Sequence, residues 1–165
     1  MIILDDELYK FYAPRAGIIP YIKIDGQLYF LLGIDRQTGE YTDMGGGLKK
    51  DENIISCAVR ELEEETKKLI CEQDFKKISI GVWEKSNCIL FCELVNKSLY
   101  DTIIKDFNQS KLKGTEYEEM SSLIWLTTDQ LKYHIYSDNS KMWSKTKYTL
   151  SNSCNFDDTL LSLFN

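Results

Sequence analysis

Carboxylate side chains are concentrated in one short run, Arg-Glu-Leu-Glu-Glu-Glu, from Arg60 to Glu65. In an α-helix, Glu61, Glu64 and Glu65 are three and four residues apart, so their carboxylates project from one side as neighbours. Like charges this close repel, which opposes folding or raises a carboxylate pKa unless a cation lies between them. A hard, oxygen-liganded ion such as magnesium would neutralise the charge directly. The spacing therefore predicts a metal site.

Three glycines precede this predicted helix. Gly45, Gly46 and Gly47 are expected in a turn between a strand and the helix, where a backbone without Cβ can bend sharply and approach a ligand or metal. Five residues separate Gly46 from Glu52, and seven lie between Glu52 and Arg60. Arg60 can hold a carboxylate in a planar bidentate contact, with Glu52 or an acid of the same helix as its expected partner.

Taken together, these residues resemble the signature of the Nudix hydrolase family, as the run Gly46-x5-Glu52-x7-Arg60-Glu61-Leu62-x-Glu64-Glu65. Each charged position of that signature is present. One departure follows Thr66, where the family usually has glycine and then an aliphatic residue, because Lys67 and Lys68 stand there. Since that glycine ends the helix in the family, its loss leaves the end of the helix open. Leu69 would take the aliphatic role one position late, with the helix continuing a little.

The resemblance covers nearly the whole chain and implies the Nudix α/β/α sandwich around a central mixed β-sheet. It also implies a magnesium-dependent pyrophosphohydrolase, in which water attacks a diphosphate linked to another moiety. Manganese could substitute for magnesium. Glu52 would support the site through water or Arg60. The implied metal ligands are Glu61, Glu64, Glu65 and a backbone carbonyl of Gly45 or Gly46.

The catalytic base is left open among Glu61, Glu64 and Glu119, and Arg60 is included with the catalytic residues. Family members often take one further acid, as a metal ligand or base, from the loop before a tryptophan-led strand. Here that tryptophan is Trp125, and Glu119 is our choice among the acids that precede it.

The substrate is left open as a nucleotide derivative, a dinucleoside polyphosphate or capped RNA. Lys49 and Lys50 are candidate phosphate contacts, although a solvated loop explains them equally well. The run from Gly45 to Leu48 resembles the triple-glycine form seen in diphosphoinositol polyphosphate and dinucleoside polyphosphate hydrolases. Such enzymes suit a basic pocket, and this acidic chain has no matching Lys/Arg cluster. A second alternative is a Nudix-fold binding or sensing module with little turnover.

Composition narrows the functional classes further. The net charge of -6 argues against a broad nucleic-acid-binding surface, so RNA decapping would need an added basic channel or partner. The only histidine, His134, excludes His-cluster metal sites and is expected to be structural. The cysteines form no CxxC pair and lie among apolar neighbours, as reduced buried thiols do. They are Cys57, Cys71, Cys88, Cys92 and Cys154.

The length of 165 residues, with 43% hydrophobic content, predicts one domain over residues 1–165. No stretch approaches about 18 uninterrupted apolar residues. The chain begins with acidic residues where a signal peptide would need a basic region. We expect a soluble cytoplasmic protein, monomeric or homodimeric, without a membrane partner.

Several elements must position these residues. Two β-rich runs, 18–24 and 27–34, flank Asp25-Gly26 and predict a hairpin. Apolar residues at three-, four- and seven-residue spacings predict an amphipathic helix from residue 53 to about 69. Residues 141–147 are expected to form a solvated loop. Further strands are expected at 78–83, 88–95 and 123–126, and further helices at 99–107, 130–136 and 156–164.

Overall fold

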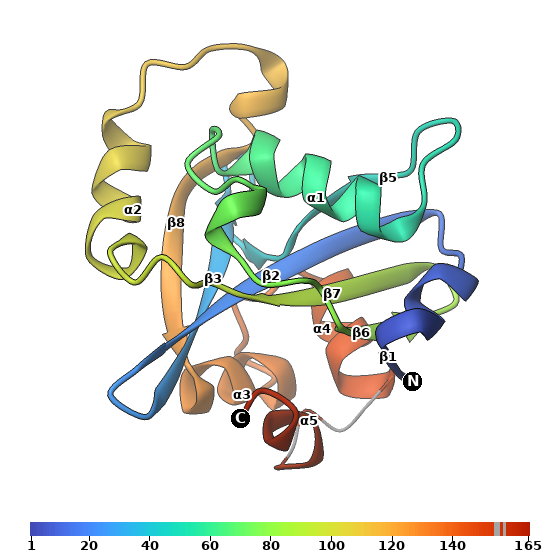
Figure 1. Cartoon of the computed structure of the whole chain (residues 1–165). Coiled ribbons are helices and arrows are strands. Elements are labelled where there is room, and N and C mark those ends of the chain that lie inside the picture. Colours follow the sequence, from blue (N-terminus) through green and yellow to red (C-terminus); the bar gives the residue numbers. More distant parts are fainter. Residues whose placement is uncertain (154–155, 157) are drawn as a thin grey trace.

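A computed structural model describes residues 1–153, 156 and 158–165, in which one mixed β-sheet is covered by helices on both sides (Figure 1). The strand order is β1-β6-β7-β2-β3-β4, with β5 pairing β2 and β8 pairing β3. β2 and β7 are parallel, whereas β2 and β3 are antiparallel. The predicted α/β/α sandwich is therefore confirmed. The strands are β1 (Ile2–Leu4), β2 (Arg15–Ile24), β3 (Gln27–Asp35), β4 (Tyr41–Thr42), β5 (Met44–Gly47), β6 (Ile80–Glu84), β7 (Asn87–Glu93) and β8 (Met120–Thr127).

The sheet divides the core in two, with helices on each side (Figure 1). One apolar cluster, including Ile18 and Leu62, lies on the side of α1 and α2, and another, including Ile19 and Phe30, lies on the opposite side. Successive side chains of β2 point to opposite faces of the sheet, so Ile18 and Ile19 join different clusters. The helices are α1 (Ile54–Glu65), α2 (Leu99–Gln109), α3 (Thr128–Tyr136), α4 (Ser144–Ser153) and α5 (Asp158–Ser162), with short 3-10 turns η1 (Asp5–Lys10), η2 (Glu72–Asp74) and η3 (Thr115–Tyr117).

The predicted hairpin is β2–β3. Ile24 pairs with Gln27, and the two residues between them, Asp25 and Gly26, have φ of 49° and 79°. Positive φ at both central positions suits a tight hairpin turn whose twist matches that of the strands. The hairpin confirms the prediction, and β2 extends back to Arg15, which pairs with Gly47 at the end of β5.

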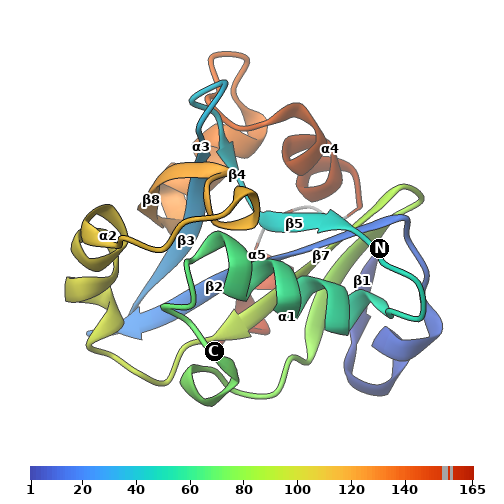
Figure 2. The same ribbon diagram turned by 90° about the horizontal axis from the view of Figure 1, so that it is seen from above.

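Helix α1 begins where the sequence indicates. Asn53 accepts a hydrogen bond from the Ser56 backbone N–H at 2.8 Å, and Ser56 Oγ accepts from the Asn53 N–H at 3.0 Å. This reciprocal pair satisfies two N–H groups that the helix itself leaves unbonded. Viewed from above, α1 lies over β2 and beside β5 (Figure 2).

The other end of α1 corrects the sequence prediction. The helix ends at Glu65, and Lys67 and Lys68 have φ of 53° and 61°. The Lys67 N–H donates to Glu64 O at 3.1 Å, and the Lys68 N–H donates to Glu63 O at 2.7 Å. These two bonds form a Schellman motif, in which a left-handed residue closes the last turn. The expected continuation of the helix is wrong, because Lys67 itself adopts the conformation that glycine usually supplies.

The remaining predicted strands and helices occur near their expected positions with different ends. Residue 157 of the predicted closing helix lies outside the described residues, and the helix found there, α5, is shorter than predicted and ends at Ser162. The expected solvated loop at 141–147 is wrong, because α4 begins there and buries Thr146 and Leu150 against the sheet. In the described part of the chain, no helix combines the length and apolar content needed to cross a membrane.

The described cysteines are reduced, as expected, and most of them are buried. Cys57, Cys88 and Cys92 are buried and unpaired, whereas Cys71 is also unpaired but only partly buried. Burial raises the pKa of the Cys57 thiol to about 11. Cys154 lies outside the described residues.

Candidate functional site

The three glycines lie in β5, which pairs antiparallel with the start of β2. The predicted turn is therefore wrong, because the glycines are extended and none has positive φ. Glycine is needed at positions 45 and 46 for close packing rather than for a turn. A Cβ on Gly46 would lie 2.3 Å from Glu61 Oε1, and a Cβ on Gly45 would lie 2.6 Å from Gly17 Cα. Glycine thus lets β5 approach both the Glu61 carboxylate of α1 and the backbone of β2.

Arg60 joins the loop after β5 to helix α1. Its Nε donates to Glu52 Oε1 at 2.6 Å and its Nη2 to Glu52 Oε2 at 3.1 Å, which is the bidentate contact expected from the sequence. Its Nη1 donates to Glu61 Oε1 at 2.6 Å and to Glu64 Oε2 at 3.3 Å. The hydrogen bonds from Arg60 lower the pKa of Glu52 to about 2. Glu52 therefore stays charged and fixes the guanidinium beside the helix carboxylates.

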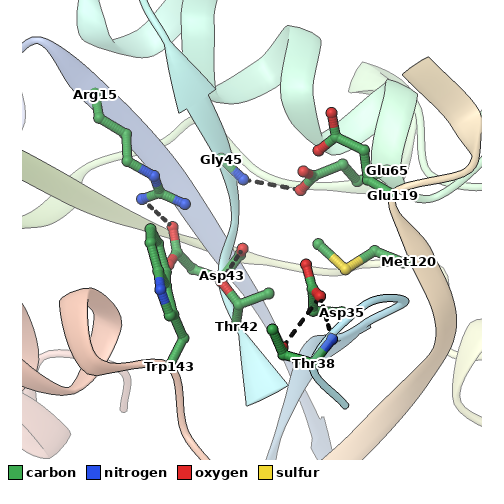
Figure 3. A pocket seen from close by; sticks show the side chains of 10 residues that line it. All are labelled: Arg15, Asp35, Thr38, Thr42, Asp43, Gly45, Glu65, Glu119, Met120 and Trp143. Atoms are coloured by element: carbon green, nitrogen blue, oxygen red, sulfur yellow. Dashed lines mark hydrogen bonds and ion pairs between the residues drawn. The ribbon is translucent and has the colours of Figure 1, made fainter. Parts of the chain in front are cut away.

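Glu65 lies at the centre of the site and is only 3% exposed. Its Oε2 accepts a hydrogen bond from the Gly45 backbone N–H at 2.9 Å. Glu119, which precedes β8, lies beside it (Figure 3). Burial, followed by the hydrogen bond with Glu119 and the charge of Glu61, raises the pKa of Glu65 well above its ordinary value. The fold therefore brings an acid from a distant segment to the α1 carboxylates.

A cavity of about 180 Å³ opens between β5, β8 and the segment before α4 (Figure 3). Arg15 is the only cationic side chain among the described residues that line it. The guanidinium carbon of Arg15 lies 5.0 Å from the centre of the Trp143 ring. The cavity therefore combines carboxylates with one aromatic-stacked cation. The lining residues are Arg15, Asp35, Thr38, Thr42, Asp43, Gly45, Glu65, Glu119, Met120 and Trp143.

A buried polar network holds Arg15 in place. Arg15 Nη1 donates to Asp43 Oδ2 at 2.8 Å and to Asn87 Oδ1 at 2.9 Å. Thr146 Oγ1 in α4 donates to Asp43 Oδ1 at 2.5 Å. Gly17 makes room for this carboxylate, because a Cβ there would lie 1.7 Å from Asp43 Oδ2. The fully buried Asp43 is thus ion-paired and hydrogen-bonded from two directions, as a buried charge requires.

Other sequence candidates lie further out. Lys49 and Lys50 are exposed in the loop after β5 and do not line the cavity. Glu64 contacts Arg60 and also lies outside the cavity lining. His134 stacks edge-on with Tyr41 and accepts a hydrogen bond from the Lys141 N–H, which agrees with a structural role.

Sequence reasoning missed Arg15, Asp43 and Trp143. They come from the start of β2, the junction of β4 and β5, and the segment before α4. Trp143 was placed in a solvated loop, whereas it is partly buried and forms a wall of the cavity. No spacing in the chain links these three residues, so only the fold brings them together.

The carboxylates have the chemistry of a divalent-cation site. Glu61, Glu64 and Glu65 offer the oxygen ligands that a hard cation prefers. Burial raises the pKa of Glu61 and of Glu65, and a cation would stabilise their charged forms. Among the described residues, no group of three His, Cys, Asp or Glu side chains is arranged to hold a metal ion. Arg60 donates to both Glu61 and Glu64. The donor set therefore fits magnesium in kind, and metal binding would compete with Arg60.

Comparison with protein-family models and with curated proteins gives no match. Solved structures do match. A Bacillus subtilis pyrophosphohydrolase, BsRppH, has 17% identity over 99% of this chain and 87% of its own, with a TM-score of 0.53. RenU, a Nudix hydrolase from M. smegmatis, has 13% identity over 90% of each chain and a TM-score of 0.53. A C. elegans Ap4A hydrolase has 18% identity over 73% of this chain and 83% of its own, with a TM-score of 0.50. At such low identity, the likeness concerns the fold, and the chain has the Nudix hydrolase fold.

Proposed function

We propose that this chain, with its Nudix fold, is a magnesium-dependent pyrophosphohydrolase acting on a nucleoside-diphosphate-linked or related polyphosphate substrate. One observation carries the proposal: the Glu61 carboxylate occupies the space that a side chain at Gly46 would need. Glu61 therefore lies directly against the glycine strand, and Glu65 of the same helix lines the cavity. The similar folds of a pyrophosphohydrolase and an Ap4A hydrolase support the same reaction class.

In this proposal the metal ligands are Glu61, Glu64 and Glu65, with a backbone carbonyl of Gly45 or Gly46. Magnesium, or manganese in its place, would supply charge neutralisation for the diphosphate and activation of the attacking water. Arg60 and its partner Glu52 hold the carboxylates in register when no ion competes for them.

Arg15 is our candidate for binding a substrate phosphate. Its Nη1 is used by Asp43 and Asn87, which fixes the guanidinium plane, and the side chain lines the cavity opposite Glu65. A planar guanidinium is well suited to phosphate oxygens. Trp143 stacks on Arg15 and limits its movement.

The single cation of the cavity also bears on substrate class. A diphosphoinositol polyphosphate carries many phosphates and needs several cations, whereas Arg15 is the only one among the described lining residues. A nucleotide derivative, a dinucleoside polyphosphate or a capped RNA end presents fewer charges at the cleaved bond. Lys49 and Lys50, exposed beyond β5, are proposed as contacts for phosphates outside the cavity.

For the proton transfer, the proposed base is one of Glu61, Glu64 and Glu119. Glu119 is the candidate that does not belong to α1, and it reaches Glu65 from the start of β8. We assign Glu119 to the reaction as a base or as an additional metal ligand. Each role requires its carboxylate to stay close to Glu65.

The test is a magnesium-dependent panel of damaged nucleotides, dinucleoside polyphosphates, nucleotide sugars, diphosphoinositols and capped RNA. Glu64→Gln should lower kcat/KM on the preferred substrate by about 100-fold or more while the protein stays folded. Glu63→Gln is the matched control, because Glu63 lies on the same helix, and among the described residues its side chain forms no ion pair with Arg60 and does not line the cavity. Unchanged turnover in Glu64→Gln would reject the metal-site assignment.

The alternative is a Nudix-fold binding or sensing module with little turnover. The acids of the signature and their Arg60 contacts are all retained, which favours the enzyme. If no substrate of the panel is cleaved and one of them binds tightly in the presence of magnesium, the binding module is the correct function.

A further inference from the structure

Strand β8 contains an extra residue at the end that leads into the cavity. The β3–β8 register shifts between Ile34 and Asp35, which leaves Ser121 without a partner in the ladder. Such a bulge moves the neighbouring side chain to the other face of the sheet. Met120 accordingly packs on the α1 side, over Gly33, where a Cβ would come within 2.5 Å of its sulfur. The cavity carboxylate that precedes Met120 is redirected with it.

Arg36 extends from a turn that its own hydrogen bonds fix. Asp35 Oδ1 accepts from the Gln37 N–H at 2.9 Å and from the Thr38 N–H at 2.8 Å. Gly39 closes the turn with φ of 74°, and its N–H donates to Asp35 O at 2.9 Å. An aspartate that accepts bonds from the next residues stabilises a turn of this kind. The starting point of the Arg36 side chain is therefore well defined.

Arg36 binds three successive carbonyl groups at the start of β8. Its backbone N–H donates to Glu119 O at 2.9 Å, its Nε to Glu118 O at 2.7 Å and its Nη2 to Met120 O at 3.3 Å. Among the described residues it forms no ion pair with a carboxylate. The guanidinium charge instead strengthens the two side-chain bonds to the Glu118 and Met120 carbonyls.

The segment before these carbonyls has little other support. Residues 110–114 form no helix or strand, and Glu119 is exposed on the chain that follows them. The only regular element between α2 and β8 is the short turn η3. The direction of Glu119 therefore depends on the bulge and on the bonds from Arg36.

We propose that Arg36 is a positioning residue that keeps Glu119 beside Glu65 and affects the reaction only through Glu119. This inference rests on the proposed function, which gives Glu119 a part in the reaction. The Arg36 side chain does not line the cavity, and its hydrogen bonds go to the backbone carbonyls of Glu118 and Met120. Its contribution is the orientation of the backbone that carries Glu119.

A double-mutant cycle tests this dependence with the wild type, Arg36→Ala, Glu119→Gln and the combined variant. Arg36→Ala should lower kcat about tenfold with little change in KM, and it should cause no further loss when Glu119 is already glutamine. Arg36→Lys should recover part of the loss, because lysine keeps the charge but lacks the fork of donors. Lys141→Ala is the control, since it removes an exposed charge that makes no bond to residues 118–120. Equal losses in both Glu119 backgrounds would overturn the proposal.

Amide hydrogen exchange gives a second readout that needs no turnover. Arg36→Ala should raise exchange severalfold in peptides covering residues 115–122 and leave the α1 peptides unchanged, because only the former depend on the Arg36 bonds. Unchanged exchange in 115–122 would overturn the positioning role even in an inactive protein. A wild type without turnover on every substrate would contradict the proposed function alone.

Discussion

The two sides of the cavity are built in different ways. On one side, the lining residues Gly45 and Glu65 belong to β5 and α1, within one stretch from position 45 to 65 that also carries Arg60 and Glu61. The other side is gathered from β2, the β4–β5 junction and the segment before α4, and it includes Arg15 and Trp143. Helical spacing brings Arg60 and the α1 carboxylates together, and β5 packs against them, whereas the second set depends on a buried network across the sheet. We therefore expect the first side to control the chemistry and the second to control both substrate contact and stability.

The contact between strand and helix on the first side can be broken by one methyl group. Gly46→Ala would place a Cβ 2.3 Å from Glu61 Oε1. The carboxylate must move, and a displacement of about 1 Å at a reacting group can cost about 100-fold in rate. We expect kcat/KM on the preferred substrate to fall by about that factor.

Gly47→Ala is the matched control for this variant. A Cβ at Gly47 would lie 3.8 Å from Pro14 O, which is ordinary contact, so the activity should stay within about twofold of wild type. If both variants retain wild-type turnover, the close approach of β5 to Glu61 has no role in the reaction.

The second side can be broken at its buried carboxylate. Asp43→Ala leaves Arg15 and Thr146 without their buried partner. Removing one member of a buried ion pair typically costs about 3–5 kcal/mol, since the remaining charge is uncompensated. We expect the free energy of unfolding, measured by urea denaturation, to fall by about 3 kcal/mol.

Asp138→Ala provides the comparison for that measurement, because Asp138 is exposed and its loss should change stability by about 0.5 kcal/mol or less. A similar midpoint and slope for the two variants would mean that the Asp43 network contributes nothing to stability.

Much of the first side could be predicted from the sequence. The start of α1 and the contact between Arg60 and Glu52 follow from local rules of helix capping, periodicity and charge pairing, as does the Asp25-Gly26 turn elsewhere in the sheet. The position of the glycines could not be predicted in the same way. Gly46 is small because Glu61 lies against it, and such an approach is a property of tertiary packing.

The second side of the cavity has fewer sequence patterns from which it could be predicted. The α4 sequence Ser-Lys-Thr-Lys-Tyr-Thr-Leu-Ser-Asn-Ser has few apolar residues and therefore no clear helical stripe. One signal was present but unused: the chain contains only three arginines, Arg15, Arg36 and Arg60. Each of them lies at the site or holds a segment that reaches it. Arginine provides a planar set of donors that lysine lacks, so the scarcity of arginine in a lysine-rich chain indicated these positions.

The smallest expected effect concerns Lys67, which follows the end of α1 at the position where the Nudix signature has glycine. Lys67 has φ of 53°, and its Nζ lies 4.1 Å from the centre of the Phe107 ring. A left-handed conformation costs a non-glycine residue roughly 1–2 kcal/mol, and the cation–π contact returns about 0.5–1 kcal/mol. Lys67→Gly should therefore raise the free energy of unfolding by up to about 1 kcal/mol.

Lys67→Ala separates the two contributions, because alanine keeps the backbone strain and loses the contact with Phe107. It should be less stable than wild type by about 0.5 kcal/mol, with urea denaturation as the measurement. Both variants should keep their activity, since α1 already ends at Glu65 and the carboxylates precede the substitution. If Lys67→Gly proves less stable than Lys67→Ala, the left-handed backbone at position 67 is not strained. The side chain of Lys67 would then be what fixes this conformation.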